Sequence, residues 1–190
     1  MTTALLVIDM QNGFCHPDAA MVKAGGDRLP NIDQIISETA DAVATARVAG
    51  YPIFFTKHQW LADRSDAPPR LKALLTPGVL TATTWDVEVL DEMKLQEGDQ
   101  IIEKNRFDAF LNTTLDQRLR LQGIDALIVA GVLTNICVES TARSASMRDY
   151  NVTVLSDCTQ ARTTEIHERA LAALDDIFAD IKLWKQVIAA

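Results

Sequence analysis

The sequence is poor in cysteine, which excludes two classes of small protein. Only three of its 190 residues are cysteine, and no pair among Cys15, Cys137 and Cys158 has the spacing of zinc ligands. So few thiols, in an odd number, cannot form a disulfide framework, and we expect reduced thiols in a cytoplasmic protein. Whether one of the three thiols does chemistry is the first question that the sequence raises.

Positive charge and long apolar runs are also scarce. Lys and Arg number 18 against 26 Asp and Glu, which gives a net charge of −8. Nucleic acids and anionic membranes require a basic face, so we expect neither as the main partner. No stretch approaches the ~20 apolar residues that span a bilayer, and the N-terminus lacks the basic start of a signal peptide. The acidic excess is spread along the chain rather than gathered in a tail, so we expect it to serve solubility.

The composition is that of an ordinary globular protein. Hydrophobic residues make up 48% and charged residues 23%. A chain of this length buries one full core, so we expect a single domain over residues 1–190. No G-x-G-x-x-G motif follows a predicted strand, which argues against a nucleotide-binding oxidoreductase.

Strand and helix patterns alternate along the chain. Apolar runs without a period of two predict buried parallel strands at residues 4–8, 52–55, 100–102, 126–130, 152–155 and, with a weaker pattern, 180–184. Helical stripes lie between them: Ile32, Ile35, Ile36, Thr39, Val43 and Arg47 before Gly50; Leu115 and Leu119 before Gly123; Val138, Ala142 and Ala145; and Ile166, Ala170, Leu174, Ile177 and Phe178 after a cap at Thr163 or Thr164. This order predicts an α/β fold with right-handed crossovers.

Residues 61–84 form the least regular segment. Asp-Ala-Pro-Pro at 66–69 and Thr-Pro-Gly at 76–78 interrupt any periodic pattern there. The segment is too long for a simple connection. We expect a functional loop or lid, with a surface excursion or an oligomer contact as the alternative.

Three polar residues follow predicted strands. Asp9 follows the first strand, Lys104 the third, and Cys137 comes after the fourth, which breaks at Gly131 and leads toward a helix. The carboxyl ends of parallel strands meet at one edge of the sheet, which is where ligands bind. A helix start and an ammonium both favour a thiolate. A carboxylate can take the thiol proton and pass it to a leaving amine.

Asp9, Lys104 and Cys137 could therefore perform acyl transfer without a histidine, with backbone amides at the helix start as the oxyanion hole. Each residue also has a simpler explanation. A cysteine near a helix start is often a small buried side chain. An Asp after a strand is often a turn residue, and Lys104 could be a solvated charge.

Three motifs resemble those of the isochorismatase-like cysteine hydrolase superfamily. They are residues 5–14 (LLVIDMQNGF), 104–110 (KNRFDAF) and 131–143 (GVLTNICVESTAR), in the family's order and over nearly the whole chain. The resemblance implies a three-layer α/β/α sandwich with a six-stranded parallel sheet, and Asp9, Lys104 and Cys137 as a catalytic triad. It also implies a cis peptide between Val132 and Leu133, an oxyanion hole from the Leu133 and Cys137 amides, and a homo-oligomer of two or more subunits.

The activity implied by the resemblance is hydrolysis of a C–N bond in a small amide, carbamoyl or ureido compound through a thioester. N-carbamoylsarcosine and ureidoacrylate amidohydrolases are members of this kind. One alternative is an ether hydrolase of the isochorismatase type, which lacks the nucleophilic cysteine, so Cys137 argues against it. The other is an idle member that serves as a binding module, against which the three filled positions argue.

Nicotinamidases of the same superfamily carry a metal on an Asp-x-His element and a further histidine after the second strand. Here residues 55–60 read FTKHQW, with one histidine and no aspartate two residues before it. We therefore expect no metal and no cofactor.

The remaining expectations concern single side chains near the motifs. We expect substrate contacts from Gln11, Phe14, His58, Trp60, Phe107 and Thr134. For Gln11, Phe14 and Phe107 a structural role is the alternative, and His58 could instead be a locally bonded loop residue. Outside the site, we expect Cys15 and Cys158 to be structural, His16 and His167 to be surface or capping groups, and Glu139 and Arg143 to form an ion pair along a helix.

Overall fold

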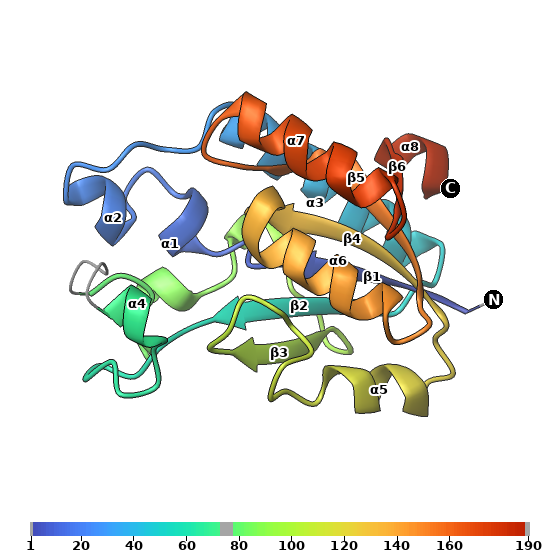
Figure 1. The fold of residues 1–190 in the computed structure, drawn as a ribbon, viewed down its shortest axis with the longest axis horizontal. Helices are drawn as coiled ribbons and strands as arrows, with labels where there is room; N and C mark the ends of the chain where they lie inside the picture. Colours follow the sequence, from blue (N-terminus) through green and yellow to red (C-terminus); the bar gives the residue numbers. More distant parts are fainter. Residues whose placement is uncertain (1, 73–77, 189–190) are drawn as a thin grey trace.

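A six-stranded parallel sheet with helices on both faces forms the centre of the molecule (Figure 1). The computed structural model describes residues 2–72 and 78–188. The strand order is β3-β2-β1-β4-β5-β6, with bounds β1 Thr3–Ile8, β2 Ile53–His58, β3 Gln100–Lys104, β4 Ala126–Val132, β5 Asn151–Gln160 and β6 Asp180–Lys182. The predicted three-layer α/β/α fold is confirmed.

The two layers of helices explain why the strands are apolar without alternation. Helices α3 (Ile32–Val48) and α8 (Trp184–Val187) cover one face, and α5 (Leu115–Leu121), α6 (Glu139–Ser146) and α7 (Thr164–Asp175) cover the other (Figure 1). In β1, Leu5 and Val7 pack on the α3 side, whereas Leu6 and Ile8 pack on the α6 side. Every side chain of β1 from Ala4 to Ile8 is therefore buried.

All six predicted strands are present, but the bounds of each differ from the predicted ones by one or more residues. Strand β4 continues through Gly131, where a break was predicted, because a glycine fits there without ending the strand. Gly131 has φ +111°, and a Cβ at this position would lie 1.9 Å from the Ile8 carbonyl oxygen. Strand β5 runs on to Gln160, and β6 ends at Lys182, so that Trp184 begins α8 instead of closing a strand.

The four predicted helices are also present. Thr163 is the cap of α7, because its hydroxyl accepts a hydrogen bond from the Ile166 amide at 3.2 Å. Gly50 and Gly123 follow α3 and α5 with positive φ, as helix-terminating glycines do. Ile177 does not belong to the buried stripe of α7: the helix ends at Asp175, and Ile177 is 75% exposed in the terminating turn.

Short helices and loops cover the carboxyl end of the sheet. They are α1 (Asn12–Cys15), α2 (Ala20–Lys23), α4 (Pro69–Lys72) and two 3₁₀ turns, Trp85–Val87 and Asp91–Met93. Within the irregular segment 61–84, Ala67, Val79 and Leu80 pack with Trp60 and Val87 in a small cluster of their own; residues 73–77 lie outside the described residues. No described helix has both the length and the apolar character required to span a membrane.

The order of the strands fixes where a ligand can bind. The chain winds outward in one direction from β1 to β2 and β3, and in the other direction from β4 to β5 and β6. At such a reversal, neighbouring connections lie on opposite faces and leave a crevice at the carboxyl ends of the two central strands. Asp9 follows β1 and Cys137 follows β4, so both residues lie at this reversal.

Candidate active site

Asp9 is fixed at the end of β1 by hydrogen bonds to both carboxylate oxygens. Its backbone is left-handed, with φ +52°, which Asp adopts more readily than most residues. The Thr56 hydroxyl donates to Oδ1 and accepts the Asp9 amide at 3.0 Å, while Lys104 Nζ donates to Oδ2 at 2.7 Å. The sequence did not predict this contact of Thr56, because a threonine inside an apolar strand carries no signal of its own.

Lys104 is a buried ammonium at the end of β3. Besides Asp9, its Nζ lies 3.1 Å from the Arg106 carbonyl, 3.3 Å from the Phe107 carbonyl and 3.1 Å from His58 Nδ1. Burial is the largest single influence and lowers the pKa of Lys104, but the interactions with Asp9 and Cys137 together outweigh it, and the net pKa is raised. Lys104 is therefore a permanent positive charge in the site, and the alternative of a solvated charge is wrong.

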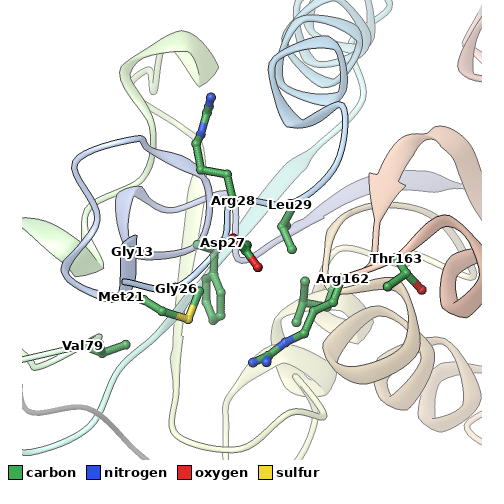
Figure 2. A pocket seen from close by; sticks show the side chains of 11 residues that line it. Gly13, Met21, Gly26, Asp27, Arg28, Leu29, Val79, Arg162 and Thr163 are labelled. Carbon is green, nitrogen blue, oxygen red and sulfur yellow. The ribbon is translucent and has the colours of Figure 1, made fainter. Parts of the chain in front are cut away.

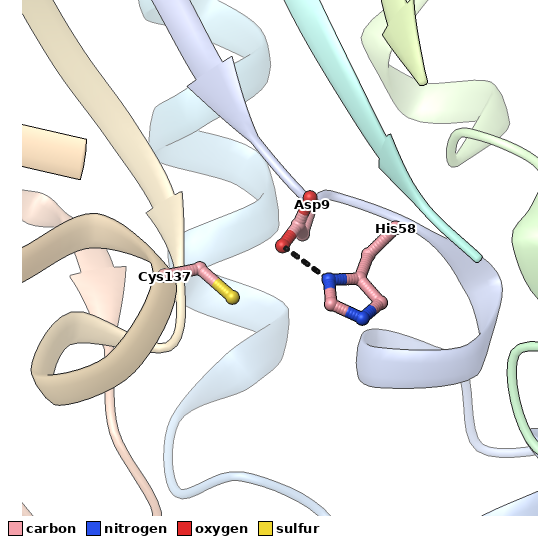
Figure 3. Close-up of side chains that lie close together, drawn as sticks. All are labelled: Asp9, His58 and Cys137. Carbon is pink, nitrogen blue, oxygen red and sulfur yellow. Dashed lines mark ion pairs between the residues drawn. The ribbon is translucent and has the colours of Figure 1, made fainter. Parts of the chain in front are cut away.

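Cys137 lies in a π-helical turn, Thr134–Val138, which we call the Cys137 turn and which leads from β4 into α6. Its Sγ, a carboxylate oxygen of Asp9 and a ring nitrogen of His58 all lie within 4.8 Å of one another (Figure 3). Burial raises the pKa of the Cys137 thiol, Lys104 lowers it, and Asp9 raises it further. The sequence predicted a lowered pKa for this thiol, and that prediction is wrong because burial outweighs the effect of the Lys104 ammonium. The thiol is therefore protonated at rest, and the Asp9 carboxylate beside it can accept the proton.

The start of the Cys137 turn has the expected backbone geometry. The Val132–Leu133 peptide is cis, as the resemblance implied. The Leu133 carbonyl accepts the Ile136 and Val138 amides at 3.0 and 3.2 Å. The carbonyl is thereby turned into the helical segment.

A cavity of about 350 Å³ lies beside the Cys137 turn. Leu133, which directly precedes the Cys137 turn, and Phe14 line the cavity, whereas Asp9, Lys104 and Cys137 are not among its lining residues. Figure 2 shows the Arg162 side chain pointing into it. Among the described residues, the Arg162 guanidinium has no hydrogen-bond or ion-pair partner. Arg28 instead turns away to pair with Asp33. The rest of the lining consists of Gly13, Met21, Gly26, Asp27, Leu29, Val79 and Thr163.

Three of the expected substrate contacts gather around His58, which is only 1% exposed. Its ring centroid lies 4.4 Å from that of Trp60, 6.0 Å from Phe107 and 6.3 Å from Phe14. His58 ends β2, directly opposite Lys104 in the register of β2 and β3. A locally bonded loop histidine is therefore the wrong description of His58, because the residue belongs to the strand and contacts Lys104.

Gln11 and Thr134 are buried, and their side-chain polar atoms form hydrogen bonds with other residues of the protein. Gln11 Nε2 donates to the carbonyls of His58 and Val87, and its Oε1 accepts the His58 amide at 2.7 Å. The geometry therefore favours the structural role for Gln11. The Thr134 hydroxyl lies 3.0 Å from that of Thr159 and 2.9 Å from His167 Nδ1.

His167 is half-buried on α7 and ties that helix to the Cys137 turn. The expectation of a surface or capping group is wrong here, because α7 packs directly against the turn. Burial lowers the pKa of His167. His16, in contrast, does cap a local turn, since its Nδ1 accepts the Asp18 amide.

The other single-residue expectations agree with the structure. Cys15 and Cys158 are buried in the core on the α3 side, and Arg143 pairs with Glu139 at 2.8 Å on α6.

The same center contains three atoms of the kinds that bind metals, from Asp9, His58 and Cys137. Lys104 Nζ, however, already contacts Asp9 Oδ2 and His58 Nδ1. A metal ion between these two atoms would have to displace a buried ammonium. The donor set as arranged therefore fits a lysine better than a metal.

Comparison with known proteins gives matches over almost the whole chain. Residues 3–186 match the family model of the Isochorismatase domain. The chain is 34% identical over 205 aligned residues to ureidoacrylate amidohydrolase RutB of Methylobacterium radiotolerans, covering 100% of this chain and 78% of that protein. A cysteine hydrolase from Pseudomonas syringae pv. phaseolicola has a TM-score of 0.89 at 29% identity, over 98% of this chain and 90% of that one. N-carbamoylsarcosine amidase from Thermoplasma acidophilum has a TM-score of 0.82 at 26% identity, over 100% of both chains.

Proposed function

This chain belongs to the isochorismatase family and is an amidohydrolase, and we propose that it cleaves a C–N bond of a small carbamoyl, ureido or amide compound through a thioester on Cys137. The observation that carries the proposal is the arrangement of Asp9. One of its oxygens is held by Lys104 at 2.7 Å, and its carboxylate faces the Cys137 thiol (Figure 3). A base, a cation and a nucleophile are thus assembled from three separate strand ends.

In the first half of the reaction, Asp9 accepts the Cys137 proton while Lys104 remains charged and holds the carboxylate in place. The thiolate attacks the substrate carbonyl carbon, and the Leu133 and Cys137 amides donate to the oxyanion. Protonated Asp9 then gives its proton to the leaving nitrogen. Ammonia or an amine departs, and the acyl group remains on sulfur.

In the second half, Asp9 takes a proton from a water molecule that attacks the thioester. The C–S bond breaks, and the sulfur recovers its proton from Asp9. The acid product leaves, and the resting state with a neutral thiol is restored. The raised pKa of Cys137 agrees with this cycle, because the free thiolate is needed only during attack.

The cavity supports a substrate that carries a carboxylate. Arg162 points into it without a partner among the described residues, and an arginine fork matches a carboxylate. The relatives named for ureidoacrylate and N-carbamoylsarcosine act on compounds of this kind. We further propose a cytoplasmic homo-oligomer that needs no metal or cofactor and binds neither nucleic acid nor membrane; sedimentation of the purified chain tests the assembly.

The test is a hydrolysis panel with the purified enzyme. Ureidoacrylate, N-carbamoylsarcosine, carbamoyl amino acids and uncharged amides are compared by ammonia release, with pyruvate release from isochorismate as the alternative reaction. We expect ammonia from the carboxylate-bearing compounds and an acyl adduct on Cys137 by mass spectrometry. Pyruvate release alone would favor the ether hydrolase, and binding without turnover of any compound would favor the idle binding module.

A further inference from the structure

His58 is held rigidly in the site but has no part in the proton transfers above. Its backbone amide donates to Gln11 Oε1 at 2.7 Å, and its carbonyl accepts Gln11 Nε2 at 3.1 Å. Trp60 and Phe107 pack against the ring on two sides. A ring that is fixed this firmly presents its two nitrogens in constant directions.

The partner of Nδ1 determines where the ring proton lies. Nδ1 is 3.1 Å from Lys104 Nζ, and an ammonium can only donate. Nδ1 must therefore accept, and a neutral imidazole that accepts at Nδ1 carries its hydrogen on Nε2. Burial first, and then the positive charges of Lys104 and Arg106, lower the pKa of His58, so the ring is neutral. Nδ1 also lies 3.9 Å from Asp9 Oδ2 (Figure 3). Because the ring is neutral and both atoms contact Lys104 Nζ, this distance does not represent a second ion pair.

Nε2 is buried and has no hydrogen-bond partner among the described residues. A buried donor without a partner costs free energy and is rare in native proteins. The rings around His58 provide no strong acceptor, and Figure 3 shows Nε2 turned away from Asp9. A hydrogen-bond acceptor on a bound ligand would satisfy this donor. The ring lies next to Asp9 and Cys137, where we propose that the substrate binds.

We propose that the Nε2–H of His58 donates a hydrogen bond to a substrate oxygen other than the carbonyl under attack, and so selects substrates with an acceptor at that position. This inference rests on the proposed function. Carboxylate, ureido and amide oxygens qualify as acceptors, whereas an analogue with a methyl or amino group there leaves the donor unpaired. Sites built around a buried donor reject such analogues strongly. Lys104 is the positioning group, because it fixes the tautomer.

The first test reads the tautomer directly. Long-range ¹H–¹⁵N spectra of the Cys137→Ala protein, with only three histidines to assign, are recorded without ligand and with ureidoacrylate or N-carbamoylsarcosine. We expect hydrogen on Nε2 of His58 in the free protein, and a downfield shift of that hydrogen in the complex. Hydrogen on Nδ1, or an unshifted Nε2–H at saturation, overturns the proposal.

The second test uses kinetics. His58→Phe removes the donor, and we expect kcat/KM to fall about 10- to 100-fold, mainly through KM. His58→Gln offers an amide donor and should recover most of the loss, while His16→Gln, away from the site, is the matched control. An unchanged KM in a folded His58→Phe protein overturns the proposal. If the wild-type protein hydrolyses none of the compounds, the proposed function fails, whereas the tautomer measurement on the free protein still decides the assignment of His58.

Discussion

Cys137 and Cys158 have similar burial but very different neighbours. Both thiols are almost completely inaccessible, and burial is the main cause that raises the pKa of each. Cys158 lies in β5 beside Asp157, whose carboxylate is already used by the Trp184 amide. Cys137 faces Asp9, and Asp9 is held by Lys104.

Neither burial nor the pKa at rest therefore separates Cys137, the proposed nucleophile, from Cys158. A thiol next to a carboxylate exists in both regions. What distinguishes the Cys137 region is the buried ammonium of Lys104, which pairs with Asp9, together with the cavity beside the Cys137 turn. The chemistry is therefore a property of the surroundings, and each prediction below alters one part of them.

The largest effect is expected from exchanging the sulfur atoms themselves. Cys137→Ser should lower kcat at least ~10³-fold, because a serine beside Asp9 is a far poorer nucleophile. Cys158→Ser should leave kcat within a few-fold of wild type and destabilise the fold by ~1–3 kcal/mol, since it buries a hydroxyl. Ammonia release and urea unfolding measure the two quantities. Equal losses of activity in both variants would show that the two regions do not differ in function.

Removing the cation should make the surroundings of Cys137 resemble those of Cys158. Lys104→Met is expected to lower kcat by ~10²-fold or more and to destabilise the protein by ~3–5 kcal/mol, because the buried Asp9 loses its partner. Lys57→Met is the matched control. Lys57 is also close to the end of a strand, but it pairs with the exposed Glu88 at 2.9 Å. A folded Lys104→Met protein with normal kcat would remove Lys104 from the mechanism.

The sequence predicts the three strand-end residues because topology alone brings them together. Asp9, Lys104 and Cys137 each follow an apolar run, and the carboxyl ends of parallel strands share one edge. Thr56 and His167 could not be found in this way. One lies inside a strand and the other inside a helix, where nothing in the neighbouring residues reveals a polar contact with a distant element.

The fold was predictable to a similar degree. Six apolar runs predicted six strands, but their ends depend on contacts between elements. Gly131 resembles a break in the sequence, yet it permits the close approach of β4 to β1. The predicted direction of the Cys137 pKa shift was wrong for a related reason. Burial raises this pKa, and the burial of a thiol depends on the packing of elements that are far apart in the chain.

A smaller effect is expected where the two regions are connected. Thr159 follows Cys158 in β5, and its hydroxyl contacts Thr134, which in turn contacts His167. His167→Phe removes one hydrogen bond that holds the Cys137 turn, and we expect kcat to fall about fivefold with KM nearly constant. The His16→Phe variant serves as a control on a histidine outside this network. A change in KM instead of kcat would indicate that His167 contacts the substrate and does not hold the turn.

The smallest effect concerns the free energy of unfolding at mildly acidic pH. The pKa of His58 is lower in the folded protein than the ordinary value of 6.5, so between these two pKa values the unfolded chain binds one more proton than the native one. The contribution of His58 is fully present above pH 6.5 and decreases as the pH falls, with a slope of at most about 1.4 kcal/mol per pH unit. Urea unfolding between pH 5 and 8 measures this slope, and His58→Gln should reduce it by the equivalent of one proton. Cys158→Ser should leave the slope unchanged, because that region has no histidine in contact with its thiol. An unaltered slope in His58→Gln would mean that His58 is already protonated in the native state. The assignment of a neutral His58 ring beside Lys104 would then be wrong.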